Sequence, residues 1–148
     1  MGTIWGKAGD GLTPIDVVKF ASAYGAWVLE KTGNSKVVIG RDARLSGDMI
    51  SRLVSATLQG LGIHVIDLGL STTPTVEFAV PREQAGGGII LTASHNPIQW
   101  NALKLLNSVG EFISDEEGKA ILDKAEKEDF SFAEVKKLGK YTLIEDYM

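Results

Sequence analysis

A short polar segment, Thr92 to Pro97, carries the residue types best suited to chemistry in this 148-residue chain. Ser94 offers a hydroxyl, His95 an imidazole and Asn96 an amide. A serine hydroxyl is a weak nucleophile unless a neighbouring group accepts its proton and other groups stabilise the developing negative charge. Because Pro97 biases Asn96 towards an extended backbone, we expect these side chains to be held in a defined loop.

Two alternatives to a reactive Ser94 can be stated. The serine can simply cap a turn, which is the ordinary role of a lone serine in a loop. A serine hydrolase is disfavoured, because the adjacent side chains of Ser94 and His95 point apart on an extended segment and the flanking residues do not form a G-x-S-x-G elbow. Lys104 supplies a positive charge nearby, although a lysine there can also lay its stem over the sheet.

Arg41 and Arg44 flank Asp42 directly after an apolar run. One interpretation is an ion pair that pins the loop. The other is an anion site, since planar guanidinium groups suit phosphate. Both interpretations can hold together.

The hydrophobic pattern predicts alternating helices and strands that would position these residues. Helices are expected to start near Pro14, Ser46, Thr73 and Ser114, and strands to cover 36–40, 63–69, 86–91 and 102–106. The third helix should end near Val80, because Pro81 cannot continue it. The strand at 63–69 alternates more than the others and is expected nearer an edge, Gly86 to Gly88 should form the turn into their strand, and a helix could begin at 144–148.

This alternation predicts a three-layer α/β/α sandwich with a mostly parallel mixed sheet of about four strands. The last predicted strand should run antiparallel, because its connection is short. Carboxyl ends of parallel strands share one edge, so Arg41, Arg44 and Ser94 should meet there.

The composition limits the cellular location and the classes of binding partner that the chain can have. The chain has 44% hydrophobic residues, a formal net charge of -4 and no cysteine. We expect a single domain over residues 1–148 in the cytoplasm, with no general attraction for nucleic acid or anionic membranes. No apolar run reaches membrane-spanning length, and the first residues lack the features of a signal peptide.

The segment Thr92 to Pro97, followed by Trp100-Asn101 and Lys104, resembles the active-site signature of the α-D-phosphohexomutases. This family includes phosphoglucomutase, phosphomannomutase and phosphoglucosamine mutase. Two further stretches are similar to the family: Gly40 to Ser46, with its Gly-Arg-Asp start, and Gly11 to Pro14. The resemblance covers essentially the whole chain, but only the first of the family's four domains.

The resemblance implies phosphoryl transfer between the 1- and 6-positions of a hexose phosphate, through a phosphoserine and a bisphosphorylated sugar. Ser94 would be the phosphoserine, His95 and Asn96 would shape its loop, and Lys104 would assist proton transfer or stabilise the phosphoryl group. Arg41, Arg44 and Asn96 are the expected phosphate-binding residues. A Mg²⁺ ion would bridge the phosphate on Ser94 and three aspartates.

The chain also departs from the family pattern. The arginine of a Ser-Gly-x-Arg-Gly-Thr element is missing before Gly2-Thr3, no Asp-Gly-Asp-x-Asp metal loop is present, and Ala102 stands where a glycine is common. We therefore expect an excised first domain, inactive alone, whose residues 141–148 begin the connection to missing domains 2–4. Such a domain should self-associate through apolar surface. The alternative is a stand-alone phosphate-binding or interaction module, and the identity of the hexose stays open.

Overall fold

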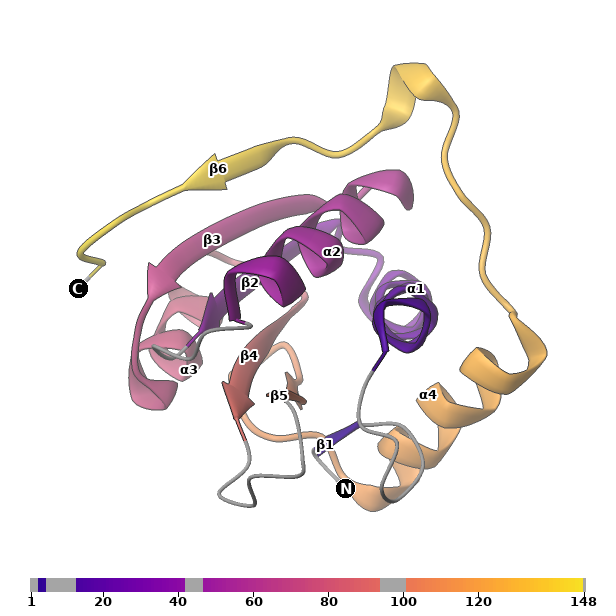
Figure 1. Ribbon diagram of the computed structural model, residues 1–148, viewed down its shortest axis with the longest axis horizontal. Helices are drawn as coiled ribbons and strands as arrows, with labels where there is room; N and C mark the ends of the chain where they lie inside the picture. The colour runs from indigo at the N-terminus through magenta and orange to yellow at the C-terminus, as the bar shows by residue number, and fades with distance from the viewer. Residues whose placement is uncertain (1–2, 5–12, 42–46, 94–100, 148) are drawn as a thin grey trace.

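The computed structural model describes residues 3–4, 13–41, 47–93 and 101–147 of the chain. In this part of the chain, helices lie on both faces of a six-stranded sheet (Figure 1). The strands are β1 (Thr3–Ile4), β2 (Lys36–Arg41), β3 (His64–Leu70), β4 (Gly87–Ala93), β5 (Asn101–Leu106) and β6 (Tyr141–Leu143). The helices are α1 (Pro14–Thr32), α2 (Gly47–Gly60), α3 (Thr73–Arg82), α4 (Asp115–Lys127) and the short η1 (Val135–Lys137).

The strand order is β1-β5-β4-β2-β3-β6. Parallel pairing joins β4 to β2, β2 to β3 and β3 to β6, whereas β5 runs antiparallel to β4 and β1 antiparallel to β5. The predicted three-layer architecture, with its mostly parallel mixed sheet and antiparallel last core strand, is confirmed. The short strands β1 and β6 extend the predicted core of four.

Both faces of the central strands are buried. Along β4, Ile89 and Leu91 belong to the core beneath α1, α2 and α4, while Ile90 belongs to the core beneath α3. Successive side chains of a strand point to opposite faces, so a strand covered on both sides reads as a continuous apolar run.

Helix starts follow their local signals. Thr13 and Asp16 form a reciprocal capping box at the start of α1, and Ser114 and Glu117 form another at α4. Gly33 ends α1 with a left-handed backbone, at a φ of 69°. These predicted boundaries are confirmed, whereas the predicted cap Ser46 lies outside the described residues.

Helix α3 corrects the predicted stop near Val80, because it continues through Pro81 to Arg82. Pro81 has no N–H to bond to the carbonyl of Glu77 and its ring crowds that carbonyl, and the helix ends one residue later, at Arg82. That carbonyl lies against Gly110, where a Cβ atom would collide with it.

The final segment corrects another expectation, because residues 144–147 do not form a helix. Strand β6 pairs with β3, and the amide of Ile144 then donates to the carbonyl of Asp67 at 2.8 Å. Consequently β3 is second from the edge, since β6 covers it. Gly139 precedes β6 where any side chain would strike the backbone of Ile63.

The glycines before the central strand were predicted to form a turn, but Gly87 and Gly88 already belong to β4. Gly87 pairs with Val37 and Gly88 with Val38. A Cβ on Gly87 would overlap the hydroxyl of Tyr24, so glycine is required there by close packing.

Candidate functional site

The candidate site lies at the edge of the sheet where β2 and β4 end. Arg41 is paired with Leu91, and Ala93 at the end of β4 is paired with Asn101 at the start of β5. Residues 94–100 connect these two strand ends. The predicted site residues Ser94, His95, Asn96 and Arg44 lie outside the described residues, whereas Arg41 and Lys104 are described.

Arg41 ends β2 with its side chain 22% exposed. Its Nη2 atom lies 4.0 Å from Oδ1 of Asp48 in the first turn of α2, and Arg52 approaches the same carboxylate at 3.4 Å. From the sequence, only Asp42 was considered as an ion-pair partner of Arg41, and Asp48 was missed. Its position in the first turn of a helix that follows the Arg41 loop was the available signal.

Lys104 is half-buried in the middle of β5, opposite Ile90 of β4 and Thr3 of β1. It shares the face of Leu106, which packs under α3, whereas Arg41 reaches Asp48 on the α2 side. The two cations thus lie on opposite faces of the sheet. Ile90, opposite Lys104, precedes Ala93 by about 10 Å along the strand.

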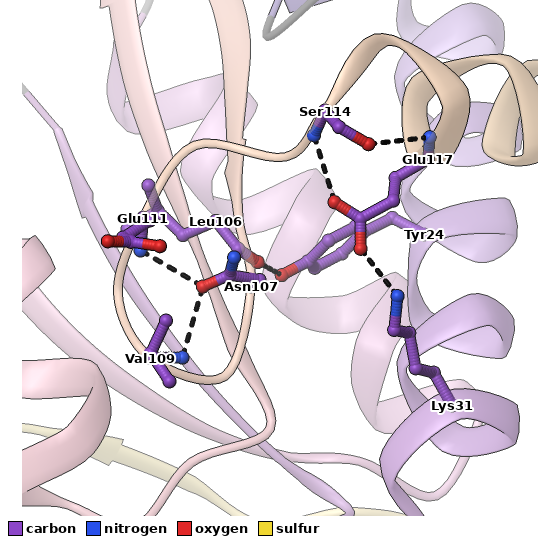
Figure 2. Close-up of polar contacts among 8 residues, drawn as sticks. All are labelled: Tyr24, Lys31, Leu106, Asn107, Val109, Glu111, Ser114 and Glu117. Carbon is purple, nitrogen blue, oxygen red and sulfur yellow. Dashed lines mark hydrogen bonds and ion pairs between the residues drawn. The ribbon is translucent and has the colours of Figure 1, made fainter.

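A buried hydroxyl holds β4 and β5 together at the opposite end of the pair. The Tyr24 hydroxyl lies 2.6 Å from the carbonyl of Leu106 (Figure 2). It also lies 3.1 Å from the carbonyl of Gly88, so its proton is shared between the two. Burial raises the pKa of Tyr24 far above its ordinary value, so this hydroxyl stays protonated. No local pattern links Tyr24 to these two carbonyls, because they lie 64 and 82 residues further along the chain.

The turn after β5 is also built from side-chain hydrogen bonds. Asn107 Oδ1 accepts from the amides of Val109 and Glu111, each at 3.0 Å (Figure 2).

Glu117 at the start of α4 accepts from the amide of Ser114 at 2.9 Å and from Lys31 of α1 at 2.5 Å. The Lys31 hydrogen bond, followed by that of Ser114, holds the pKa of the Glu117 carboxyl below its usual range.

The described residues place two cations, Arg41 and Lys104, on the strands that flank the end of β4. Among residues 3–4, 13–41, 47–93 and 101–147, no three or more His, Cys, Asp or Glu side chains are grouped so that they could hold a metal ion. Within the same ranges, no helix has the length and apolar character needed to cross a membrane. Arg41 and Lys104 instead provide positive charge on either side of the strand that leads into Ser94.

Comparison with known proteins adds the family context. The family described as phosphoglucomutase/phosphomannomutase, alpha/beta/alpha domain I, matches residues 3–132. A phosphoglucosamine mutase of Nautilia profundicola is 36% identical over 141 residues, which cover 95% of this chain and 32% of that protein. A phosphoglucomutase/phosphomannomutase of Thermococcus kodakarensis is 34% identical over 148 residues, which cover 97% of this chain and 32% of that protein.

A solved structure agrees with the sequence relatives. The crystal structure of a putative phosphomannomutase from Thermus thermophilus superimposes with a TM-score of 0.73 and is 37% identical, covering 87% of this chain and 28% of that one. The chain spans about a third of the length of the curated relatives it matches, with 32% coverage for both mutases above. Sequence, fold and strand arrangement together show that the chain belongs to the phosphoglucomutase/phosphomannomutase family and represents its α/β/α domain I.

Proposed function

We propose that this chain is the phosphoserine-bearing first domain of a phosphohexomutase, which interconverts hexose 1-phosphate and hexose 6-phosphate. The observation that carries the proposal is the family match over residues 3–132, which includes the whole Ser94 segment. The relatives' names support the same reaction class. The topology is compatible with it, because Ser94 follows directly on the last residue of β4, at the carboxyl edge where open α/β sheets bind ligands.

In the proposed reaction, Ser94 Oγ carries a phosphoryl group. The Oγ–P bond breaks while a hydroxyl of the hexose monophosphate bonds to phosphorus, and that hydroxyl loses its proton to a base. The resulting bisphosphate returns its other phosphoryl group to Ser94, which leaves the isomeric monophosphate. Catalysis of such a transfer is mainly positioning and stabilisation of negative charge.

The other predicted site residues take supporting roles in this proposal. Lys104 and Arg41 stabilise the phosphoryl group from the two faces of the sheet, and Arg44 binds phosphate. His95 and Asn96 shape the loop that presents Ser94. The position of Arg41 at the end of β2 supports this role, and its Nη2 atom lies 4.0 Å from the Asp48 carboxylate.

A Mg²⁺ ion remains part of the proposal only for a longer protein. The described residues do not form a set of metal ligands. The ion would therefore be held by the phosphate on Ser94 and by carboxylates beyond this chain, and we assign no step to it. The cytoplasm is the proposed location, on the basis of a cysteine-free composition.

The first experiment tests whether the isolated chain is inactive. We expect no conversion of glucose 1-phosphate with Mg²⁺ present, because the chain spans only about a third of its mutase relatives. Robust Mg²⁺-dependent turnover by this chain alone would contradict the inactivity.

The second experiment uses the full reading frame that encodes this chain. If it continues past Met148 into an Asp-Gly-Asp loop, the full protein should have mutase activity. Ser94→Ala should lower kcat/KM by about a thousandfold or more. Ser108→Ala, a matched change at an exposed turn serine, should leave it unchanged. A frame without the metal loop, encoding a protein that binds sugar phosphate but never transfers phosphate, would favour the binding-module alternative.

A further inference from the structure

We infer that a cavity between α2, β3 and β6 binds a small organic cation with a primary ammonium group. This α2–β6 cavity has a volume of about 230 Å³. Ser51, Ser55 and Gln59 line it from α2, Asp67 from β3 and Tyr141 from β6. The inference does not depend on the proposed mutase reaction, since it uses neither Ser94 nor Lys104.

An unpaired buried hydroxyl is the first observation. Ser55 is 4% exposed, and its Oγ atom has no hydrogen-bond partner. In α1, by contrast, the hydroxyls of Ser22 and Thr32 each donate at 2.7 Å to the carbonyl four residues earlier. Buried polar groups normally have partners, so an orphaned hydroxyl beside a cavity indicates a missing ligand atom.

A buried carboxylate is the second observation. Asp67 is 5% exposed and has no ion pair within the described part of the chain. It accepts hydrogen bonds from the Tyr141 hydroxyl at 2.5 Å and from the Gly69 amide at 2.8 Å. Asp48 at the cavity wall differs, because Arg41 and Arg52 both approach it. Of the two carboxylates that line the cavity, Asp67 is therefore the one without an ion pair among the described residues.

The remaining groups mostly accept hydrogen bonds. Tyr141 already donates its proton to Asp67, and burial together with that carboxylate raises its pKa to about 12, so the phenol keeps this proton at neutral pH. Gln59 already donates from Nε2 to the carbonyl of Gly139 at 3.0 Å, which leaves its Oε1 atom as an acceptor. The cavity thus offers a carboxylate, an amide oxygen and hydroxyl oxygens to a donor.

A primary ammonium group matches this inventory. It has three N–H donors and one positive charge, which suit the Asp67 carboxylate and the hydroxyl oxygens of Ser51 and Ser55. An anion is disfavoured, because Arg52 at the exposed rim is already paired with Asp48 and Asp67 would repel the ligand. The volume admits a chain of only a few carbon atoms.

A nuclear magnetic resonance titration tests the inference directly. We expect n-propylammonium chloride to produce saturable shifts of the Ser51, Ser55 and Asp67 amides. Sodium chloride at equal ionic strength and 1-propanol, the neutral analogue, should produce none that saturate. Shifts of equal size with 1-propanol, or no saturation with propylammonium, would overturn the inference.

Two variants and a control separate binding from folding. Asp67→Asn should weaken propylammonium binding by about tenfold or more, and Ser55→Ala should weaken it by a smaller factor, because hydrogen bonds to charged groups are the stronger ones. Ser22→Ala changes a buried helical serine outside the cavity and should bind like the parent. If Asp67→Asn loses its folded spectrum, Ser55→Ala decides, and parental affinity in Ser55→Ala contradicts the inference.

Discussion

The hydroxyl of Tyr24 reaches from α1 to carbonyls on two neighbouring strands, Gly88 of β4 and Leu106 of β5. The space it needs is free because residue 87 is a glycine. The Tyr24 side chain therefore holds β4 and β5 together, and the lack of a side chain at Gly87 leaves room for it. The other end of this strand pair leads into Ser94. This coupling explains why glycines can stand inside a central strand, where they otherwise weaken pairing.

We predict that Gly87→Ala lowers the free energy of unfolding by about 1–3 kcal/mol, because the new methyl group would overlap the Tyr24 hydroxyl. Urea denaturation followed by circular dichroism measures the change. Gly60→Ala is the matched control, since its nearest contact is the movable Phe132 ring at 3.4 Å. An unchanged urea midpoint in Gly87→Ala would refute this account of the strand.

At the scale of elements, two ion pairs connect α4 to α1, and the first goes through Glu117. Glu117 closes the capping box of α4 with Ser114 and also accepts from Lys31 in the last turn of α1. A second connection joins Lys124 of α4 to Glu30 of α1. Both connections are electrostatic and add to the apolar packing of Ile121 and Ala125, so the electrostatic part of the attachment of α4 should depend on pH.

We predict that acid weakens this attachment through Glu117. Its folded-state pKa is lowered, so its contribution to stability is complete above the ordinary glutamate pKa of about 4.3 and is lost as the pH falls towards the depressed value. Between about pH 6 and pH 3, Glu117→Gln should therefore lose less stability than the parent, by at most about 1 kcal/mol. Urea denaturation at several pH values measures this difference.

Glu116 provides the control for that series, because it is an exposed neighbour in the same helical turn. Glu116→Gln should keep the parental dependence of stability on pH. Parallel stability profiles for Glu117→Gln and the parent would show that Lys31 and Ser114 do not stabilise the ionised carboxylate.

On the scale of the whole molecule, apolar surface remains uncovered beside α1. Ile15 is 74% exposed and Phe132 58% exposed, and both line a groove of about 380 Å³ with Val18, Leu53 and Phe130. Contiguous exposed apolar surface favours association. Such a surface agrees with a domain that spans about a third of its relatives.

We predict that the chain self-associates through this groove as its concentration rises. Ile15→Lys should weaken the association, because it places a charge where apolar contact is made. Val109→Lys, at an exposed residue in a turn outside the groove, should not. Sedimentation equilibrium measures the average mass, and a monomer at every concentration would contradict the prediction.

Much of the frame could be predicted from short-range patterns. The helix starts near Pro14 and Ser114 and the strand over 86–91 depend on neighbouring residues, and they were predicted. The ion pair between Arg41 and Asp48 was missed, because it depends on how α2 turns back over β2. The end of α3 was placed too early, because the helix includes Pro81 and ends at Arg82.

The alternation of helices and strands could be predicted from the sequence, because it follows from local hydrophobic periodicity, and the family was indicated by the resemblance of the Ser94 segment to a known motif. The strand order, the pairing of β6 with β3 and the hydrogen bond that joins Asp67 to Tyr141 across them appear only in the tertiary structure. The Tyr24 clamp and the α2–β6 cavity likewise arise between distant segments. Such contacts depend on how separate elements meet in space, which no short stretch of sequence records.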